Sequence, residues 1–241
     1  MDYKETEWYG FKCLEFKLLD RRALLVVPNQ PNGSGKWLLK TEYFGAFPNF
    51  EIEMLKRGYY LAYIANKTRW YHPSDSDAKA ELCKFLQREF SLSEKCVPVG
   101  MSCGGMHAVY FADRYPEHIA ALYLDAPVLN LLSCPCKLGV ATNGFYEEFV
   151  EHTGVTVSEL LNYRNHPIDR AESIVKNNIP VMLICGDSDD TVPYVENGKI
   201  LSEYMRANGG ILTEILKPNC NHHPHGLEDV APLVEFVEKY Y

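Results

Sequence analysis

Short apolar runs alternate with helical patterns along most of the chain, and this alternation limits the folds that it can adopt. The runs typical of β-strands are residues 11–18, 23–27, 59–65, 95–99, 119–124, 181–185 and 211–216. Patterns typical of helices are found at residues 50–57, 74–90, 105–115, 168–177, 194–208 and 227–240. The central strand runs are almost continuously apolar, as in strands covered on both faces. We therefore predict an α/β fold with a mainly parallel sheet and helices on both faces.

The length of the chain fits one domain of this kind with little added to it. Its 241 residues contain no internal repeat, no tract of low complexity and no linker rich in serine and glycine. Residues 128–166 form the one long interval without a strand pattern. We predict a single domain over residues 1–241, in which residues 128–166 form a small cap over one edge of the sheet.

Composition narrows the range of partners and compartments. The formal net charge of −8 would repel a phosphate backbone, so nucleic acid is not expected as a partner. Because no apolar stretch reaches ~18 residues, no membrane partner is expected either. The polar start of the chain lacks the basic and apolar segments of a secretory signal, which favours a cytoplasmic location. We expect a monomer or homodimer that acts on a small molecule.

The segment Gly100-Met101-Ser102-Cys103-Gly104 has the pattern Gly-x-Ser-x-Gly and stands between a strand run and a helix pattern. In that context the pattern is typical of a nucleophile elbow, a sharp turn that presents a serine hydroxyl at the end of a strand. We therefore predict that Ser102 is a nucleophile. The thiol of Cys103 is a weaker alternative, because no pattern of a cysteine protease surrounds it and the turn exposes Ser102 instead.

A serine nucleophile needs a base, and the base needs a carboxylate to orient it. In this architecture the three follow one another in the chain as serine, acid and histidine. Asp189 follows the strand run 181–185, and His222 follows the strand run 211–216. Because the carboxyl ends of parallel strands meet at one edge of a sheet, we predict that Asp189 and His222 lie beside Ser102.

Other carboxylates compete with Asp189 for the orienting role. Asp125 follows the strand run 119–124 and is the second choice. Asp187 and Asp190 lie on the same turn as Asp189 and are interpreted as turn or capping carboxylates.

Other histidines compete with His222 for the role of base. His223 is the main alternative, and His225 is interpreted as a residue that lines the site or bonds the loop backbone. The three histidines also suggest a metal site. We do not favour it, because zinc sites usually have a further ligand at a recognisable spacing, and none is evident. No metal or organic cofactor is predicted.

Acyl transfer also needs two donors for the oxyanion that forms during the reaction. The backbone N–H of Cys103, directly after the nucleophile, is the predicted first donor. We expect the second from the loop at residues 28–37, which follows the strand run 23–27 and contains glycines that permit close backbone approach. Which amide of this loop donates is left open.

The predicted α/β fold with Ser102, Asp189 and His222 at its strand ends resembles the α/β-hydrolase superfamily. The resemblance extends over essentially the whole chain. Several segments more narrowly resemble a bacterial subgroup related to prolyl-oligopeptidase-type and acetylxylan-esterase-type serine hydrolases. These are residues 35–37, 43–45, 100–105, 125–128, 192–197 and 222–227. Some relatives carry arginine after the serine, where this chain has Cys103, so any substrate contact of that arginine is missing here.

The resemblance implies a carboxylic ester hydrolase with a Ser-His-Asp triad and an acyl-enzyme intermediate, acting on small or carbohydrate-linked esters. A small aminopeptidase or prolyl-oligopeptidase-like peptidase, a thioesterase and a lactonase are alternatives, because all use the same triad. A non-catalytic binding protein on a hydrolase scaffold is an alternative from another class. That alternative predicts a broken triad, whereas all three candidate members are present in order.

Overall fold

The computed structural model describes residues 2–241. These residues contain an open sheet with the strand order β1-β2-β3-β5-β4-β6-β7-β8-β9. The strands are β1 (Lys4–Trp8), β2 (Phe11–Leu18), β3 (Arg21–Val27), β4 (Trp37–Lys40), β5 (Tyr60–Ile64), β6 (Val97–Met101), β7 (Leu122–Asp125), β8 (Val181–Gly186) and β9 (Leu212–Lys217).

The sheet is antiparallel at its amino-terminal end and parallel elsewhere. Strands β1 to β3 and the β3–β5 pair are antiparallel, and every pair from β5 through β9 is parallel. The prediction of a mainly parallel α/β sheet is therefore confirmed. The sequence patterns missed β1, which is exposed and mostly polar, and β4, which has four residues. The strand β1 therefore forms the edge of the sheet next to β2.

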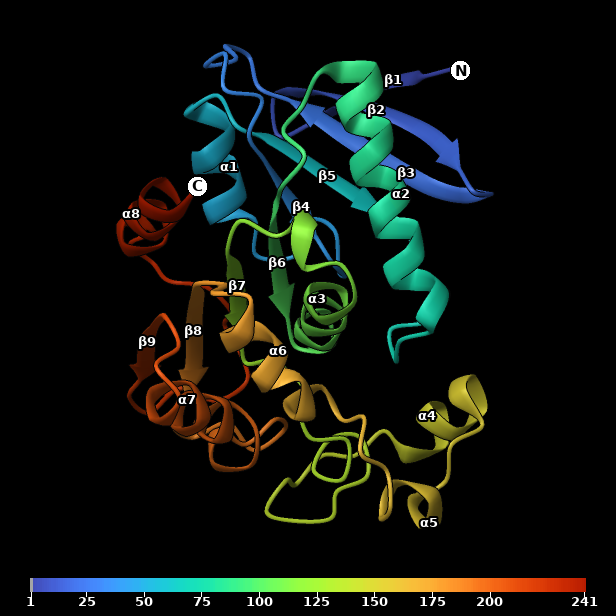
Figure 1. Cartoon of the computed structure of the whole chain (residues 1–241), viewed down its shortest axis with the longest axis vertical. Helices are drawn as coiled ribbons and strands as arrows, with labels where there is room; N and C mark the ends of the chain where they lie inside the picture. The colour runs from blue at the N-terminus through green and yellow to red at the C-terminus, as the bar shows by residue number, and fades with distance from the viewer. Residues whose placement is uncertain (1) are drawn as a thin grey trace.

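Helices cover both faces of the sheet (Figure 1). They are α1 (Asn49–Lys56), α2 (Pro73–Phe90), α3 (Cys103–Arg114), α4 (Tyr146–Thr153), α5 (Val157–Leu160), α6 (Ala171–Lys176), α7 (Gly198–Ala207) and α8 (Ala231–Tyr240). Apolar side chains of α2, α3, α6 and α7 share one core with the sheet, and those of α1 and α8 share a second core on the opposite face. Two buried cores thus fix the strand ends on which the site is built. None of the described helices is long and apolar enough to cross a membrane.

One predicted helix, residues 194–208, is interrupted for a physical reason. A 3-10 turn, Tyr194–Glu196, is separated from α7 by Asn197, whose backbone leaves the helical region at φ −129° and ψ −89°. The buried Asn197 side chain accepts the backbone N–H groups of Leu129 and Asn130 at 2.9 and 2.8 Å. Through these two hydrogen bonds, Asn197 links the turn to the chain that follows β7.

The segment between β7 and α6 includes the interval 128–166 and holds α4 and α5. It lies beyond the carboxyl ends of the parallel strands, at the foot of the molecule in Figure 1. Its buried side chains form a third apolar cluster with Trp70 and Met106. That this segment acts as a cap stays a prediction.

Candidate active site

Ser102 occupies the turn between β6 and α3, one residue after the strand ends and one before the helix begins. Its backbone has φ 52° and ψ −121°, a conformation that costs free energy and persists only when the surroundings enforce it. The N–H of Ser102 donates to the Asp125 carbonyl at 2.9 Å, and its own carbonyl accepts the N–H of Val128 at 3.0 Å. These bonds to the chain after β7 hold the strained turn in place.

Two glycines allow close packing at this turn, Gly100 against the start of α3 and Gly105 against the chain that follows β7. A Cβ atom on Gly100 would lie 2.6 Å from the Gly104 carbonyl oxygen. A Cβ atom on Gly105 would lie 2.3 Å from the Cβ of Pro127. Both distances are far below van der Waals contact, so the close packing that exposes Ser102 requires glycine at both positions.

The structure brings the three residues predicted as a triad into one chain of hydrogen bonds. Nε2 of His222 lies 3.1 Å from Oγ of Ser102, and Nδ1 of His222 lies 2.8 Å from Oδ2 of Asp189. Asp189 and His222 are both buried. Because an ionised carboxylate only accepts hydrogen bonds, Nδ1 carries the proton and Nε2 presents its lone pair to the serine hydroxyl.

Asp189 is held by its own turn after β8. Its Oδ1 atom accepts the backbone N–H groups of Thr191 and Val192 at 2.9 and 2.8 Å. Of the competing acids on this turn, Asp187 accepts the Ser188 hydroxyl at 2.8 Å and Asp190 accepts the Thr191 hydroxyl at 3.3 Å.

Asp125, the second choice for the acid, bonds a different histidine. Its Oδ1 atom lies 2.6 Å from Nδ1 of His225, while its Oδ2 atom accepts the Gly226 N–H at 2.7 Å and the Tyr123 hydroxyl at 3.0 Å. Burial opposes ionisation of Asp125, but the bonds to His225 and Gly226 outweigh it and lower the carboxyl pKa. A second Asp–His pair therefore lies beside the first, and sequence reasoning did not connect these two residues.

His223, the alternative base, is exposed, and its ring stacks on that of Phe47 with centroids 5.6 Å apart. No hydrogen bond joins its ring to a carboxylate within residues 2–241. The geometry of a base oriented by an acid is thus found at His222.

The side chain of Cys103 is unsuited to the role of nucleophile. Burial raises the pKa of its thiol to about 11, so the thiol stays protonated near neutral pH, and the thiolate is the nucleophilic form. Its backbone N–H belongs to the first turn of α3, where N–H groups have no partner within the helix. This N–H is therefore available at the position predicted for the first oxyanion donor.

The loop expected to supply the second oxyanion donor, residues 28–37, lies at the opposite edge of the sheet. Val26 of β3 faces Leu61 at the start of β5, because β3 is antiparallel to its neighbour. The carbonyl of Gly35 accepts the N–H of Ser93, which precedes β6, whereas Ser102 follows β6. The expectation is wrong because it assumed that β3 runs parallel to β6.

The loop after β4, which the sequence analysis did not detect, borders the site instead. The Thr41 hydroxyl donates to the Gly104 carbonyl at 2.7 Å, and Tyr43 lies in the cavity beside Ser102. Burial raises the pKa of the Tyr43 phenol, as does the neighbouring Cys103 thiol, so the hydroxyl keeps its proton. Recognition of β4 as a strand would have pointed to this loop.

A cavity of about 380 Å³ opens in front of Ser102. Aromatic rings from three parts of the chain line it, namely those of Phe47, Trp70 and Phe145. Arg69 also lines the cavity, but its guanidinium pairs through two nitrogens with Glu148 of α4, and its centre lies 4.9 Å from the Phe145 ring. Among residues 2–241, those that line the cavity include no carboxylate.

A comparison with protein families matches residues 54–241 to the prolyl oligopeptidase family. This match covers most of the chain. The chain belongs to the prolyl oligopeptidase family. Members of this family are serine hydrolases of the α/β-hydrolase superfamily, so the predicted kinship is confirmed.

Solved structures of peptidases share the fold of this prolyl oligopeptidase family member. Acylaminoacyl peptidase from Pyrococcus horikoshii has a TM-score of 0.69 and 17% identity, over 91% of this chain and 38% of the other. A putative dipeptidyl aminopeptidase IV from Bacteroides ovatus has a TM-score of 0.71 and 14% identity, over 99% and 36%. Dipeptidyl peptidase 4 from Porphyromonas gingivalis has a TM-score of 0.68 and 13% identity, over 100% and 35%. This chain spans little more than a third of their lengths, and the likeness shows the α/β-hydrolase fold.

Proposed function

We propose that the chain is a serine peptidase that cleaves short peptides whose amino end carries no charge, through an acyl-enzyme on Ser102. The observation that carries this proposal is the continuous chain of hydrogen bonds from Asp189 through His222 to Ser102. A cavity lined by aromatic rings, with no carboxylate among its described lining residues, supports the choice of an uncharged amino end.

The reaction follows from the positions of the protons. Oγ of Ser102 attacks the scissile carbonyl as Nε2 of His222 accepts its proton. Asp189 keeps the proton of His222 on Nδ1 and stabilises the imidazolium ion. His222 then protonates the leaving amine, which departs and leaves an ester on Ser102. Water, deprotonated by His222, hydrolyses this ester and restores the serine.

Two groups are proposed to stabilise the oxyanion. One is the N–H of Cys103, and the other is the phenol of Tyr43, whose raised pKa keeps it a donor. A donor fixed in a partly buried cavity stabilises developing charge more than one in water does.

Replacing Tyr43 by phenylalanine is expected to lower kcat by ~10²- to 10³-fold, the usual loss when one oxyanion donor is removed. KM should change little, because the bond strengthens only as charge develops on the oxygen. Steady-state kinetics on one peptide anilide measures both constants, and Tyr63→Phe, which changes a tyrosine outside the cavity, is the matched control. A kcat within twofold of the wild type would exclude Tyr43 as a donor.

Substrate class follows from the charges around the cavity. A substrate with a free amino group would bring an ammonium ion into a cavity with no carboxylate among the described residues that line it, and burying an unpaired charge is costly. Glu148, which lies beside the cavity, is already paired with Arg69. An N-acylated peptide avoids this cost, and acylaminoacyl peptidase is the name of one similar structure. A carboxylic ester is the second candidate, because its acyl group is also uncharged and needs the same groups.

The test compares N-acetyl-phenylalanine p-nitroanilide, phenylalanine p-nitroanilide and p-nitrophenyl butyrate. We expect kcat/KM for the acetylated anilide to exceed that for the free amine by at least ~10-fold, since ~1.4 kcal/mol of unpaired charge suffices for that ratio. A preference for the free amine would contradict the proposed substrate class. Cleavage of the ester alone would favour the ester hydrolase, and the Ser102→Ala variant supplies the background rate for each substrate.

A further inference from the structure

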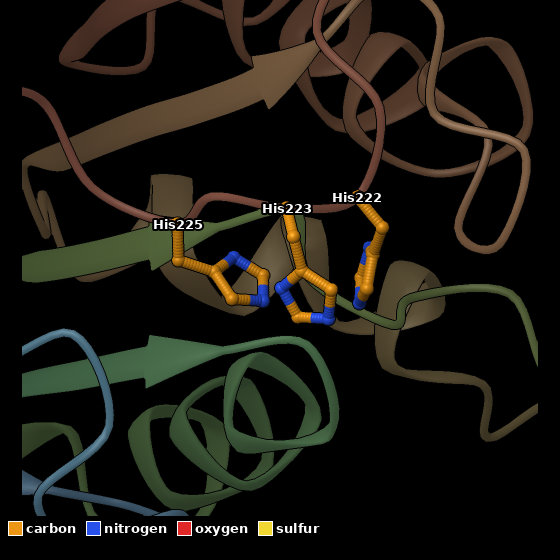
Figure 2. A group of neighbouring side chains, drawn as sticks. All are labelled: His222, His223 and His225. Atoms are coloured by element: carbon orange, nitrogen blue, oxygen red, sulfur yellow. The ribbon is translucent and has the colours of Figure 1, made fainter.

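Three imidazole rings lie together directly after β9. His222, His223 and His225 extend to the same side of one stretch of chain (Figure 2). Each pair of ring centroids is 4.9 Å apart, and one ring nitrogen from each residue lies within 4.8 Å of the others. All three rings line the cavity in front of Ser102, so a small solute in the cavity can reach them. The rings thus form an accessible triangle of nitrogen donors.

Two of the three rings are already oriented as metal ligands are. Nδ1 of His222 bonds Asp189 and Nδ1 of His225 bonds Asp125, at 2.8 and 2.6 Å. A carboxylate in this position fixes the proton on Nδ1, leaves the lone pair on Nε2 and increases its basicity, as around zinc-bound histidines in general. The sequence analysis predicted the support of His222 by Asp189, but not that of His225 by Asp125, which ends another strand.

The third ring has the freedom to complete a site. The exposed ring of His223 contacts Phe47 by stacking and makes no hydrogen bond within residues 2–241. Zinc–nitrogen bonds of ~2.0–2.1 Å in a tetrahedral site require donors closer together than the present 4.8 Å limit. Binding therefore requires the three rings to approach one another, and His223 is the one whose ring no hydrogen bond fixes within residues 2–241.

We propose that His222, His223 and His225 bind a divalent transition metal of the zinc type, and that the bound metal switches off hydrolysis. The imidazoles bind in their neutral form, with water at the fourth position. The second part rests on the proposed function. Nε2 of His222 has one lone pair, so it cannot bind a metal and accept the proton of Ser102 at the same time. Inhibition is therefore expected to be reversible by a chelator.

Binding is tested by equilibrium dialysis of the chelator-treated full chain against zinc chloride. We expect one zinc ion per chain, and at least ~100-fold weaker binding for His223→Gln, because even the carboxylate partners of zinc ligands contribute 10- to 100-fold. Two control variants remove other residues that could bind zinc. His152→Gln removes an exposed histidine of α4, and Cys220→Ser removes the partly exposed thiol at the start of the loop that carries the three histidines. Both controls should bind zinc as the wild type does. Absence of binding at micromolar zinc, or equal binding by His223→Gln, would overturn the site.

Inhibition is tested separately with p-nitrophenyl butyrate and with a fluorophosphonate probe. Saturating zinc should reduce the rate to below ~1% of the metal-free rate of the same variant, because an unactivated serine is a weak nucleophile. Excess chelator should restore the rate. Zinc that binds stoichiometrically without lowering the rate would contradict inhibition through His222. A metal-free chain that neither reacts with the probe nor hydrolyses any ester would contradict the proposed function, while dialysis still decides the metal site.

Discussion

Replacing Ser102 by alanine is expected to lower kcat by about 10⁴- to 10⁶-fold on any substrate that the wild type cleaves. The change removes the oxygen that forms the acyl-enzyme but leaves β6, α3 and the cavity unchanged. The residual rate reflects binding and oxyanion stabilisation alone. Single-turnover kinetics and labelling by a fluorophosphonate probe measure the loss.

The matched control for this variant is Cys103→Ala, which changes the neighbouring side chain and keeps the backbone N–H. It should stay within about 10-fold of the wild-type kcat, because the proposed role of Cys103 lies in its N–H and a protonated thiol is a poor nucleophile. If Cys103→Ala lost activity and Ser102→Ala kept it, the thiol would be the nucleophile. Circular dichroism and thermal melting establish that both variants are folded.

Replacing Asp189 by asparagine is expected to lower kcat by ~10⁴-fold, with the fold retained. Asparagine keeps the size of the side chain, and its oxygen can still accept the N–H groups of Thr191 and Val192. Its amide, however, can donate to Nδ1 of His222, which favours the tautomer with the proton on Nε2. That tautomer cannot accept the proton of Ser102. Initial rates at a fixed pH measure the loss, and Asp187→Asn on the same turn is the control, expected near wild-type activity.

Asp125→Asn separates the two Asp–His pairs. Because Asp125 bonds His225 and Gly226, its replacement should mainly lower the melting temperature. The fall in kcat should be smaller than in Asp189→Asn. If Asp125→Asn lowered kcat more than Asp189→Asn in folded protein, the assignment of the orienting acid would be wrong.

Much of the fold was predictable because its signals are local. Buried parallel strands are continuous apolar runs, so β5 through β8 were each located to within a few residues. The edge strand β9 was located as well, although none of its residues is buried. Strand direction has no local signal: β3 has the same apolar core as the parallel strands, yet it is antiparallel to β5. Because the direction of β3 was mispredicted, the loop at residues 28–37 was expected at the edge of the sheet that carries Ser102, whereas it lies at the opposite edge.

In the site, too, residues within a local motif could be predicted, whereas contacts between distant parts of the chain were harder to predict. The Gly-x-Ser-x-Gly turn is local, so Ser102 could be placed from its flanking strand and helix. Asp189 and His222 followed from chain order and strand ends, and the structure places them beside Ser102. The pairing of Asp125 with His225, 100 residues apart, could not be read from spacing. Tyr43, the proposed second donor, was missed because β4, which precedes it, is only four residues long.

The most direct test of the central claim is to locate the adduct of a fluorophosphonate probe by mass spectrometry of the digested full chain. We expect one adduct per chain, on the peptide that contains Ser102, and its loss after prior denaturation, because only the folded triad activates the hydroxyl. An adduct on another residue, or none on protein that still hydrolyses a substrate, would contradict the account of this chain as a serine hydrolase acting through Ser102.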